Sequence, residues 1–113
     1  MKTLVGIWIV AHAQMSANDI TLDFKNETME IINSGYKVWS NDSASDSGLL
    51  TLYDGTKQMD MLGTEGPNKG KVFRCIWKRE DEALIICYSQ TDRPTTFGTT
   101  EENKFVLIKW IKK

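Results

Sequence analysis

Apolar and polar residues alternate along most of this chain, and turn residues interrupt the alternation at short intervals. A period of two places successive side chains on opposite faces of a strand. Frequent turn signals between short segments are typical of a meandering all-β domain. The pattern predicts strands at residues 4–11, 20–25, 28–32, 36–40, 49–53, 57–62, 72–78, 83–89 and 105–111.

Three details of the pattern bear on the path of the chain. In residues 20–25, Ile20, Leu22 and Phe24 share one face, as expected for a strand. Residues 36–40 are expected to continue the strand of residues 28–32 after a break. The polar, Ser/Asp-rich residues 41–47 are expected to form a mobile loop.

Cys75 and Cys87 lie on the two arms of a predicted hairpin. A two-residue turn at Glu80-Asp81 would pair Cys75 with Ile86 and place Cys87 on the opposite face. A three-residue turn would bring the two cysteines face to face and permit a disulfide. We expect the two-residue turn and reduced, buried thiols.

Short strands with one apolar face each must close on themselves or pack as two sheets, because a lone sheet leaves that face wet. A small antiparallel up-and-down barrel of about eight strands satisfies this need and also removes exposed strand edges. The chain has 113 residues, which fits one domain spanning residues 1–113.

Charge and composition exclude several classes of protein. The chain carries 14 Lys and Arg against 15 Asp and Glu, a balance that gives no electrostatic signal for nucleic acid or an anionic membrane surface. No apolar run reaches the roughly 18 residues of a membrane span. Residues 1–13 resemble a short secretory signal, but a first strand fits them better. We therefore expect a cytoplasmic protein, exported only if Met1 to Ala13 is a signal peptide.

Two stretches of the chain resemble an uncharacterised bacterial lipocalin-like domain family. The first is Gly6-Ile7-Trp8, a Gly-x-Trp opening in which the glycine lets the strand bend and the tryptophan plugs one end of the barrel. The second runs to a Leu-x-x-Cys strand, Leu84–Cys87, and an Arg-Pro-Thr-x-Phe loop, Arg93–Phe97. The resemblance implies a lipocalin-like barrel for nearly the whole chain and no established activity.

The sequence favours a protein without catalysis, metal or cofactor. His12 is the only histidine, so a Cys–His catalytic pair would need His12 beside Cys87, and we do not expect this arrangement. The two cysteines have no metal-ligand spacing. The acidic clusters at residues 80–82 and 101–102 lie in predicted turns, where charges are normally solvated.

Arg93 is the polar residue of greatest interest, and three interpretations of it stay open. Its guanidinium can stack on Trp8 and close the barrel, as in lipocalins, or lie exposed on its loop, or bind an anionic ligand. The large side chains predicted to face inward either fill the core or line a cavity. The candidate ligand-binding residues are Trp8, Phe24, Met59, Met61, Trp77 and Arg93.

Two functional hypotheses follow from this lining, ahead of a third and less favoured one, an enzyme that uses Arg93 and a carboxylate. The first is a non-enzymatic carrier or sensor that binds a small apolar ligand in the barrel. The alternative is a protein-interaction module, such as an inhibitor or immunity-type partner, whose barrel is filled and whose outer surface binds a protein. A cavity would favour the first, and a continuous exposed apolar patch, with Trp39 or Tyr53 outside, would favour the second.

Overall fold

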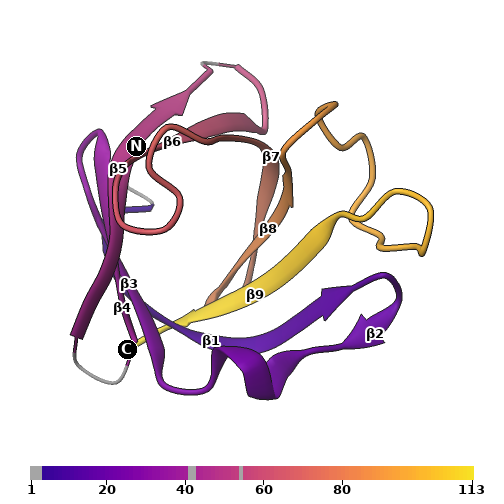
Figure 1. The fold of residues 1–113 in the computed structure, drawn as a ribbon, viewed down its shortest axis with the longest axis horizontal. Helices are drawn as coiled ribbons and strands as arrows, with labels where there is room; N and C mark the ends of the chain where they lie inside the picture. Colours follow the sequence, from indigo (N-terminus) through magenta and orange to yellow (C-terminus); the bar gives the residue numbers. More distant parts are fainter. Residues whose placement is uncertain (1–3, 41–42, 54) are drawn as a thin grey trace.

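The computed structural model describes residues 4–40, 43–53 and 55–113, and it is an all-β barrel (Figure 1). One short 3-10 helix, η1 (Thr21–Phe24), is the only helix of the described residues. The strands are β1 (Gly6–Met15), β2 (Asn18–Asp19), β3 (Glu27–Ile32), β4 (Gly35–Ser40), β5 (Ser43–Leu52), β6 (Gln58–Glu65), β7 (Val72–Glu80), β8 (Ala83–Ser89) and β9 (Val106–Lys112).

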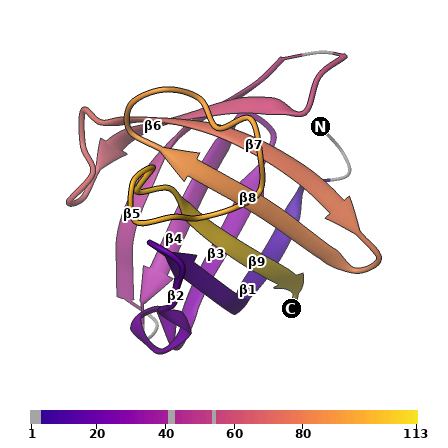
Figure 2. The same cartoon turned by 90° about the vertical axis from the view of Figure 1, so that its right-hand side faces the viewer.

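Eight of these strands form a closed, antiparallel, up-and-down barrel, which confirms the predicted fold class. From β3 to β9 each strand pairs with the next one along the chain, and β1 closes the ring by pairing with both β3 and β9. The two-residue β2 extends the far end of β1 as a small hairpin (Figure 2). No helix in the described part of the chain is long and apolar enough to cross a membrane.

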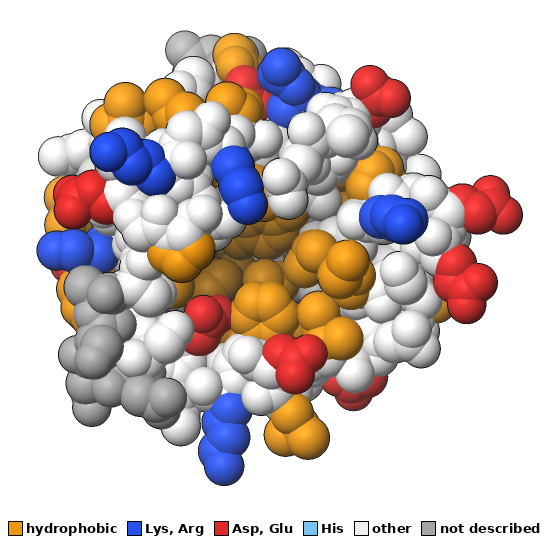
Figure 3. Space-filling model, in the orientation of Figure 1, with side chains coloured by type: hydrophobic (Ala, Val, Ile, Leu, Met, Phe, Trp, Pro, Cys, Tyr) orange, Lys and Arg blue, Asp and Glu red, His pale blue; other side chains and the backbone are white. Residues whose placement is uncertain are grey.

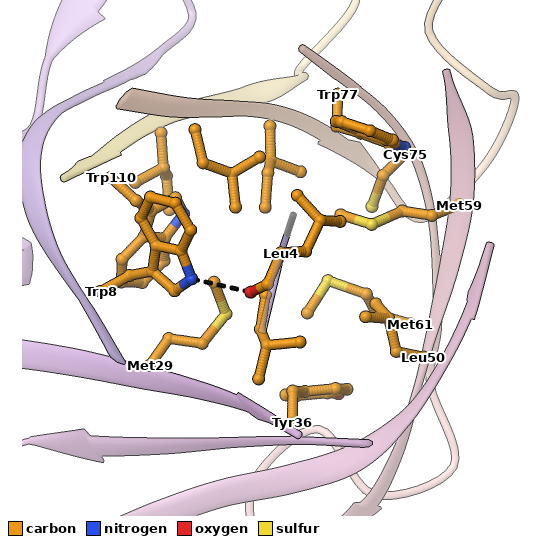
Figure 4. Close-up of a cluster of buried hydrophobic side chains, with 14 of the residues drawn as sticks. Leu4, Trp8, Met29, Tyr36, Leu50, Met59, Met61, Cys75, Trp77 and Trp110 are labelled. Atoms are coloured by element: carbon orange, nitrogen blue, oxygen red, sulfur yellow. Dashed lines mark hydrogen bonds between the residues drawn. The ribbon is translucent and has the colours of Figure 1, made fainter. Parts of the chain in front are cut away.

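Trp8 plugs one end of the barrel, as the Gly-x-Trp segment predicts. Trp8 and Leu4 are completely buried, and the Trp8 indole N–H donates a hydrogen bond of 3.0 Å to the Leu4 carbonyl (Figure 4). The Arg79 guanidinium and the Lys112 ammonium each lie 5.1 Å from the centre of the Trp8 ring, within the range of a cation–π contact. Large apolar side chains therefore fill this end of the interior.

Residues 20–25 do not form the predicted strand. They form η1 instead, and Leu22 on its surface is 84% exposed. The Asp19 carboxylate accepts hydrogen bonds from the Thr21 amide and hydroxyl, and the Ala13 amide donates to the Thr21 hydroxyl. These local side-chain hydrogen bonds stabilise a helical turn, although the alternation of apolar and polar residues favours a β-strand.

The middle of the chain also differs from the sequence prediction. Residues 36–40 form a separate strand, β4, because a tight turn with Asn33 at a φ of 47° reverses the chain after β3. Residues 43–47, expected to be loop, belong to β5 and pair with β4, whereas residues 41–42 lie outside the described residues. Irregularities in register on both sides of this segment accommodate its extra residues.

The β7–β8 hairpin has a register that neither sequence alternative contained. Glu80 pairs with Ala83, so the two-residue turn is Asp81-Glu82, and Asp81 adopts a φ of 53°. Cys75 pairs with Tyr88, two positions beyond the predicted Ile86. A slip of two residues keeps every side chain on its face. The expected outcome therefore holds, and both cysteines are buried free thiols.

The long segment between β8 and β9 covers the outside of the barrel. Figure 2 shows it passing in front of β7 and β8. Pro94 is fully buried, and the Lys78 ammonium of β7 lies 4.6 Å from the centre of the Phe97 ring. This cover explains why nearly all of β8 is buried, on its outward as well as its inward face.

Candidate functional site

The barrel holds a cavity of about 260 Å³ away from the Trp8 plug. Figure 3 shows it as a central hollow whose floor is apolar. The wall combines apolar side chains, two tyrosines and three polar residues: Phe24, Glu27, Met29, Tyr36, Val38, Asp46, Met61, Asn68, Phe73, Tyr88, Val106, Ile108 and Trp110. The interior is therefore filled at one end and open to a ligand at the other.

Strand alternation explains how most of these side chains reach the cavity. On β6, Met61 points inward, and its neighbour Leu62 lies on the outer surface. On β9, Val106, Ile108 and Trp110 follow each other at every second position and all line the cavity. With Met61 on β6, Phe73 on β7 and Tyr88 on β8, they form a continuous wall across four neighbouring strands.

A glycine lets Tyr36 lie flat against the wall. Gly48 is the cross-strand partner of Tyr36, and a Cβ at Gly48 would lie 2.7 Å from the Tyr36 hydroxyl oxygen. The same Cβ would lie within 2.1 Å of the Leu62 carbonyl oxygen, which is backbone and cannot move aside easily. Glycine at this position therefore sets both the approach of the strands and the shape of the cavity.

The two tyrosines are neutral hydrogen-bonding groups inside an apolar wall. Burial, with a smaller effect of the Asp46 charge, raises the pKa of Tyr36 to about 12. Burial also raises the pKa of Tyr88 well above its ordinary value, and the Tyr88 hydroxyl accepts a hydrogen bond of 3.2 Å from the Trp110 indole. The Tyr88 ring meets the Phe73 ring edge-on, with centroids 6.4 Å apart.

Two carboxylates and one amide complete the cavity. Glu27 accepts a hydrogen bond of 3.1 Å from the Ser40 hydroxyl, and Asp46 Oδ2 accepts one of 2.5 Å from the Asn68 side-chain amide. The other Asp46 oxygen, Oδ1, is buried and has no hydrogen-bond partner. Burial raises the pKa of Glu27; the Ser40 hydrogen bond opposes this rise and the Asp46 charge adds to it.

Phe24 and Met61 are the two candidate ligand-binding residues that the structure places in the cavity wall. Phe24 arrives from η1 rather than from a strand. Trp8, Met59 and Trp77 face the interior, as predicted, but they belong to the packed core outside the cavity wall. Of the tryptophans, Trp110 lines the cavity.

Arg93 does not stack on Trp8, so that interpretation is wrong. It lies on the outside of the barrel, where its guanidinium pairs with Asp60 at 2.6 Å and donates to the Met59 and Cys75 carbonyls at 2.9 Å each. Its guanidinium also lies 5.4 Å from the centre of the Tyr53 ring. Asp60 points outward because it alternates with the inward Met59 and Met61. Arg93 thus fastens the segment after β8 to the outer wall.

Sequence reasoning identified none of the polar residues of the cavity wall, which are Glu27, Tyr36, Asp46, Asn68 and Tyr88. Tyr36 and Tyr88 stand at alternate positions of predicted strands, and that alternation could have identified them as inward. Glu27 precedes the predicted strand 28–32, and Asp46 falls in the segment expected to be a loop, so no periodic signal marked either. Only the closed register of β3, β4 and β5 brings them to one cavity.

The described residues contain no group of three or more His, Cys, Asp or Glu side chains that could hold a metal ion. Burial raises the pKa of the Cys87 thiol to about 11 and that of Cys75 further still. Both thiols are therefore protonated near neutral pH, which makes them poor nucleophiles and poor metal ligands.

No family model, curated protein or solved structure matches the chain. The barrel and the buried Trp8 are consistent with the lipocalin-like resemblance. The specific family stays a prediction.

Proposed function

We propose that this protein is a non-enzymatic barrel that binds a small molecule with an apolar body. The observation that carries the proposal is the cavity of about 260 Å³ with its mainly apolar wall. An engineered protein cavity of about 150 Å³ already holds benzene. The cavity of this barrel therefore has room for a molecule of one or two rings or a short alkyl chain.

Burial supplies the affinity in this proposal. A ligand that buries about 200 to 300 Å² of apolar surface gains roughly 5 to 7 kcal/mol at about 25 cal/mol per Å². Association and ordering reduce this gain. Without these costs the gain corresponds to a Kd of about 0.2 mM to 10 μM, so a weaker Kd, in the submillimolar to millimolar range, is expected for a purely apolar probe.

The composition of the wall supports binding rather than catalysis. The thirteen residues of the wall include no His, Cys, Ser or Thr. A Ser–His or Cys–His pair is therefore missing from the wall. The wall offers carboxylates, an amide and neutral tyrosines, which can orient a ligand by hydrogen bonds and charge.

Cavity filling tests the proposal. Binding of 1-octanol or naphthalene is measured by calorimetry for the wild type, and Trp110 in the wall provides an independent fluorescence signal. Met61→Trp should fill the cavity and abolish binding, whereas Leu62→Trp places the same side chain outside and should bind as the wild type does. Val106→Phe serves as a second cavity variant if Met61→Trp does not fold. Absence of binding by the wild type to every probe of this size would refute the proposal.

A second candidate function, protein binding, is favoured by one surface feature. Leu49, Leu62 and Val72 are exposed on the outer face of three neighbouring strands, β5 to β7. Leu62 pairs across the sheet with both Leu49 and Val72, so these three side chains form a continuous apolar row. The exposed Ile32 lies in line with them but is separated from Leu49 by Gly35. Trp39 is only half-buried, and Tyr53 is 41% exposed. Exposed apolar rows of this kind mark interaction sites.

Native mass spectrometry of the protein from its own host separates the two candidates. A mass increment of a few hundred daltons that Met61→Trp removes supports the ligand. A co-purifying protein that Leu62→Lys releases, while Met61→Trp retains it, supports the interaction module.

A further inference from the structure

The charge of the cavity restricts what it can bind. Glu27 and Asp46 are the only ionisable residues of its wall apart from the two neutral tyrosines. Figure 3 shows acidic side chains at the lower rim of the hollow and a Lys or Arg side chain at its upper rim. The three ion pairs among the described residues use Asp60 or Glu80 as the acid, so neither cavity carboxylate takes part in one of them.

Asp46 is the less satisfied of the two carboxylates. Its Oδ2 atom has the Asn68 amide, but its Oδ1 atom is buried without a hydrogen bond. The Oδ1 atom packs beside Gly66 and is closed to the cavity, so a ligand meets this carboxylate through its charge rather than through that atom. A positively charged group therefore interacts with Asp46 more favourably than a neutral one.

Glu27 adds a second negative charge near the first. The Asp46 charge contributes to the raised pKa of Glu27, so the two groups interact electrostatically. With no Lys, Arg or His in the wall, the two carboxylates repel each other and repel an anion that comes close to them. The same pair attracts an ammonium group, and the Trp110, Tyr88 and Phe73 rings can add cation–π contacts.

We infer that the ligand is a cationic amphiphile, in which an ammonium group is bound by Asp46 and Glu27 and an apolar body fills the wall of Met61, Val106 and Ile108. The inference rests on the proposed function, since it names the class of molecule for the same cavity. It excludes fatty acids and other carboxylates, because their head group would meet two like charges. It equally excludes phosphate esters.

Three ligands with one chain and different head groups test this inference: n-octylammonium, 1-octanol and octanoate. Calorimetry at neutral pH and low salt should give the order octylammonium, octanol, octanoate, with at least a tenfold difference in Kd between the first two. Asp46→Asn should reduce octylammonium binding at least tenfold and leave octanol binding unchanged. Glu27→Gln should reduce it by a smaller factor. Glu30→Gln, on the same strand but outside the cavity wall, is the matched control and should change neither.

The outcomes separate this inference from the proposed function. If octanol and octanoate bind as tightly as octylammonium, or if Asp46→Asn and Glu27→Gln both keep the amine preference, the barrel binds apolar molecules but the cationic class is wrong. If no ligand binds, the proposed function fails and the inference fails with it. If Asp46→Asn does not fold, the head-group series on the wild type and on Glu27→Gln decides the matter.

Discussion

Replacing Arg93 by alanine should destabilise the barrel by removing the fastening of the segment after β8. The Arg93 guanidinium makes three short contacts, one with the Asp60 carboxylate at 2.6 Å and two with the Met59 and Cys75 carbonyls at 2.9 Å. The two charged side chains are 20% and 15% exposed, so water screens their attraction only in part.

The expected loss is about 2 kcal/mol. Hydrogen bonds to charged groups contribute about 1.5 to 3 kcal/mol each, but these three share one guanidinium and are not additive. Asp60 also retains the Tyr53 hydroxyl at 2.5 Å and the Arg74 guanidinium at 3.9 Å, so its charge is not left alone. For 113 residues at about 2.1 cal/mol/K per residue, 2 kcal/mol lowers Tm by about 8 °C.

Thermal and urea unfolding followed by circular dichroism measure this loss. Arg74→Ala is the matched control, because it also removes an arginine beside Asp60, but a more distant and half-exposed one; it should cost less than about 0.5 kcal/mol. Arg93→Lys keeps the charge and should give an intermediate loss, because lysine lacks the planar fork. Equal, small losses for Arg93→Ala and Arg74→Ala would refute the assigned role of Arg93.

Three further outcomes are expected. Burial would raise the pKa of Asp60, but the hydrogen bonds and charges of its partners lower it on balance. Its contribution to stability is therefore present above about pH 4 and lost as the pH falls through the lowered pKa. In acid unfolding, the stability difference between the wild type and Arg93→Ala should shrink below about pH 4 but not vanish, because the bonds of Arg93 to the two carbonyls do not titrate. Ellman's reagent at pH 8 should leave Cys75 and Cys87 unreacted in the folded protein and count two thiols in denaturant without reductant, whereas a count of zero would indicate a disulfide. A chain lacking residues 1–13 should aggregate or lose its cooperative melting transition, because β3 and β9 both lose a neighbour; a soluble, cooperatively melting product would contradict this.

The alternation of side chains predicted the barrel because each strand has one buried face. The residues on that face are apolar and occupy every second position. It failed at residues 20–25, where Asp19 and Thr21 satisfy the backbone locally and a helical turn replaces the ladder. It failed again at residues 43–47, because backbone pairing with β4, rather than apolar side chains, holds that segment in the sheet. Backbone pairing depends little on the type of side chain, so the sequence of this polar segment does not reveal it.

The position of the Arg93 side chain could not be predicted from the sequence, for a different reason. A loop arginine finds its partner by the path of the loop, and the partner here, Asp60, lies 33 positions away on the outward face of β6. Arg79, next to the β7–β8 turn, and Lys112 lie over Trp8 instead. The prediction that Arg93 covers the tryptophan was therefore wrong, because neither of these two cations belongs to the loop that carried the lipocalin-like pattern.

The division of the barrel into a filled and a hollow end separates stability from binding. Leu4 and Trp8 occupy the closed end, where two cations also cover the indole, so a substitution there removes packing that nothing else replaces. At the open end, Met61 and Val106 border empty space, and a larger side chain can enter it without the strain that overpacking normally brings. A carboxylate such as Asp46, with one buried oxygen that lacks a hydrogen bond, stabilises that end less than an apolar side chain would. This is the reason for proposing that the cavity binds a charged ligand rather than being a gap left by packing.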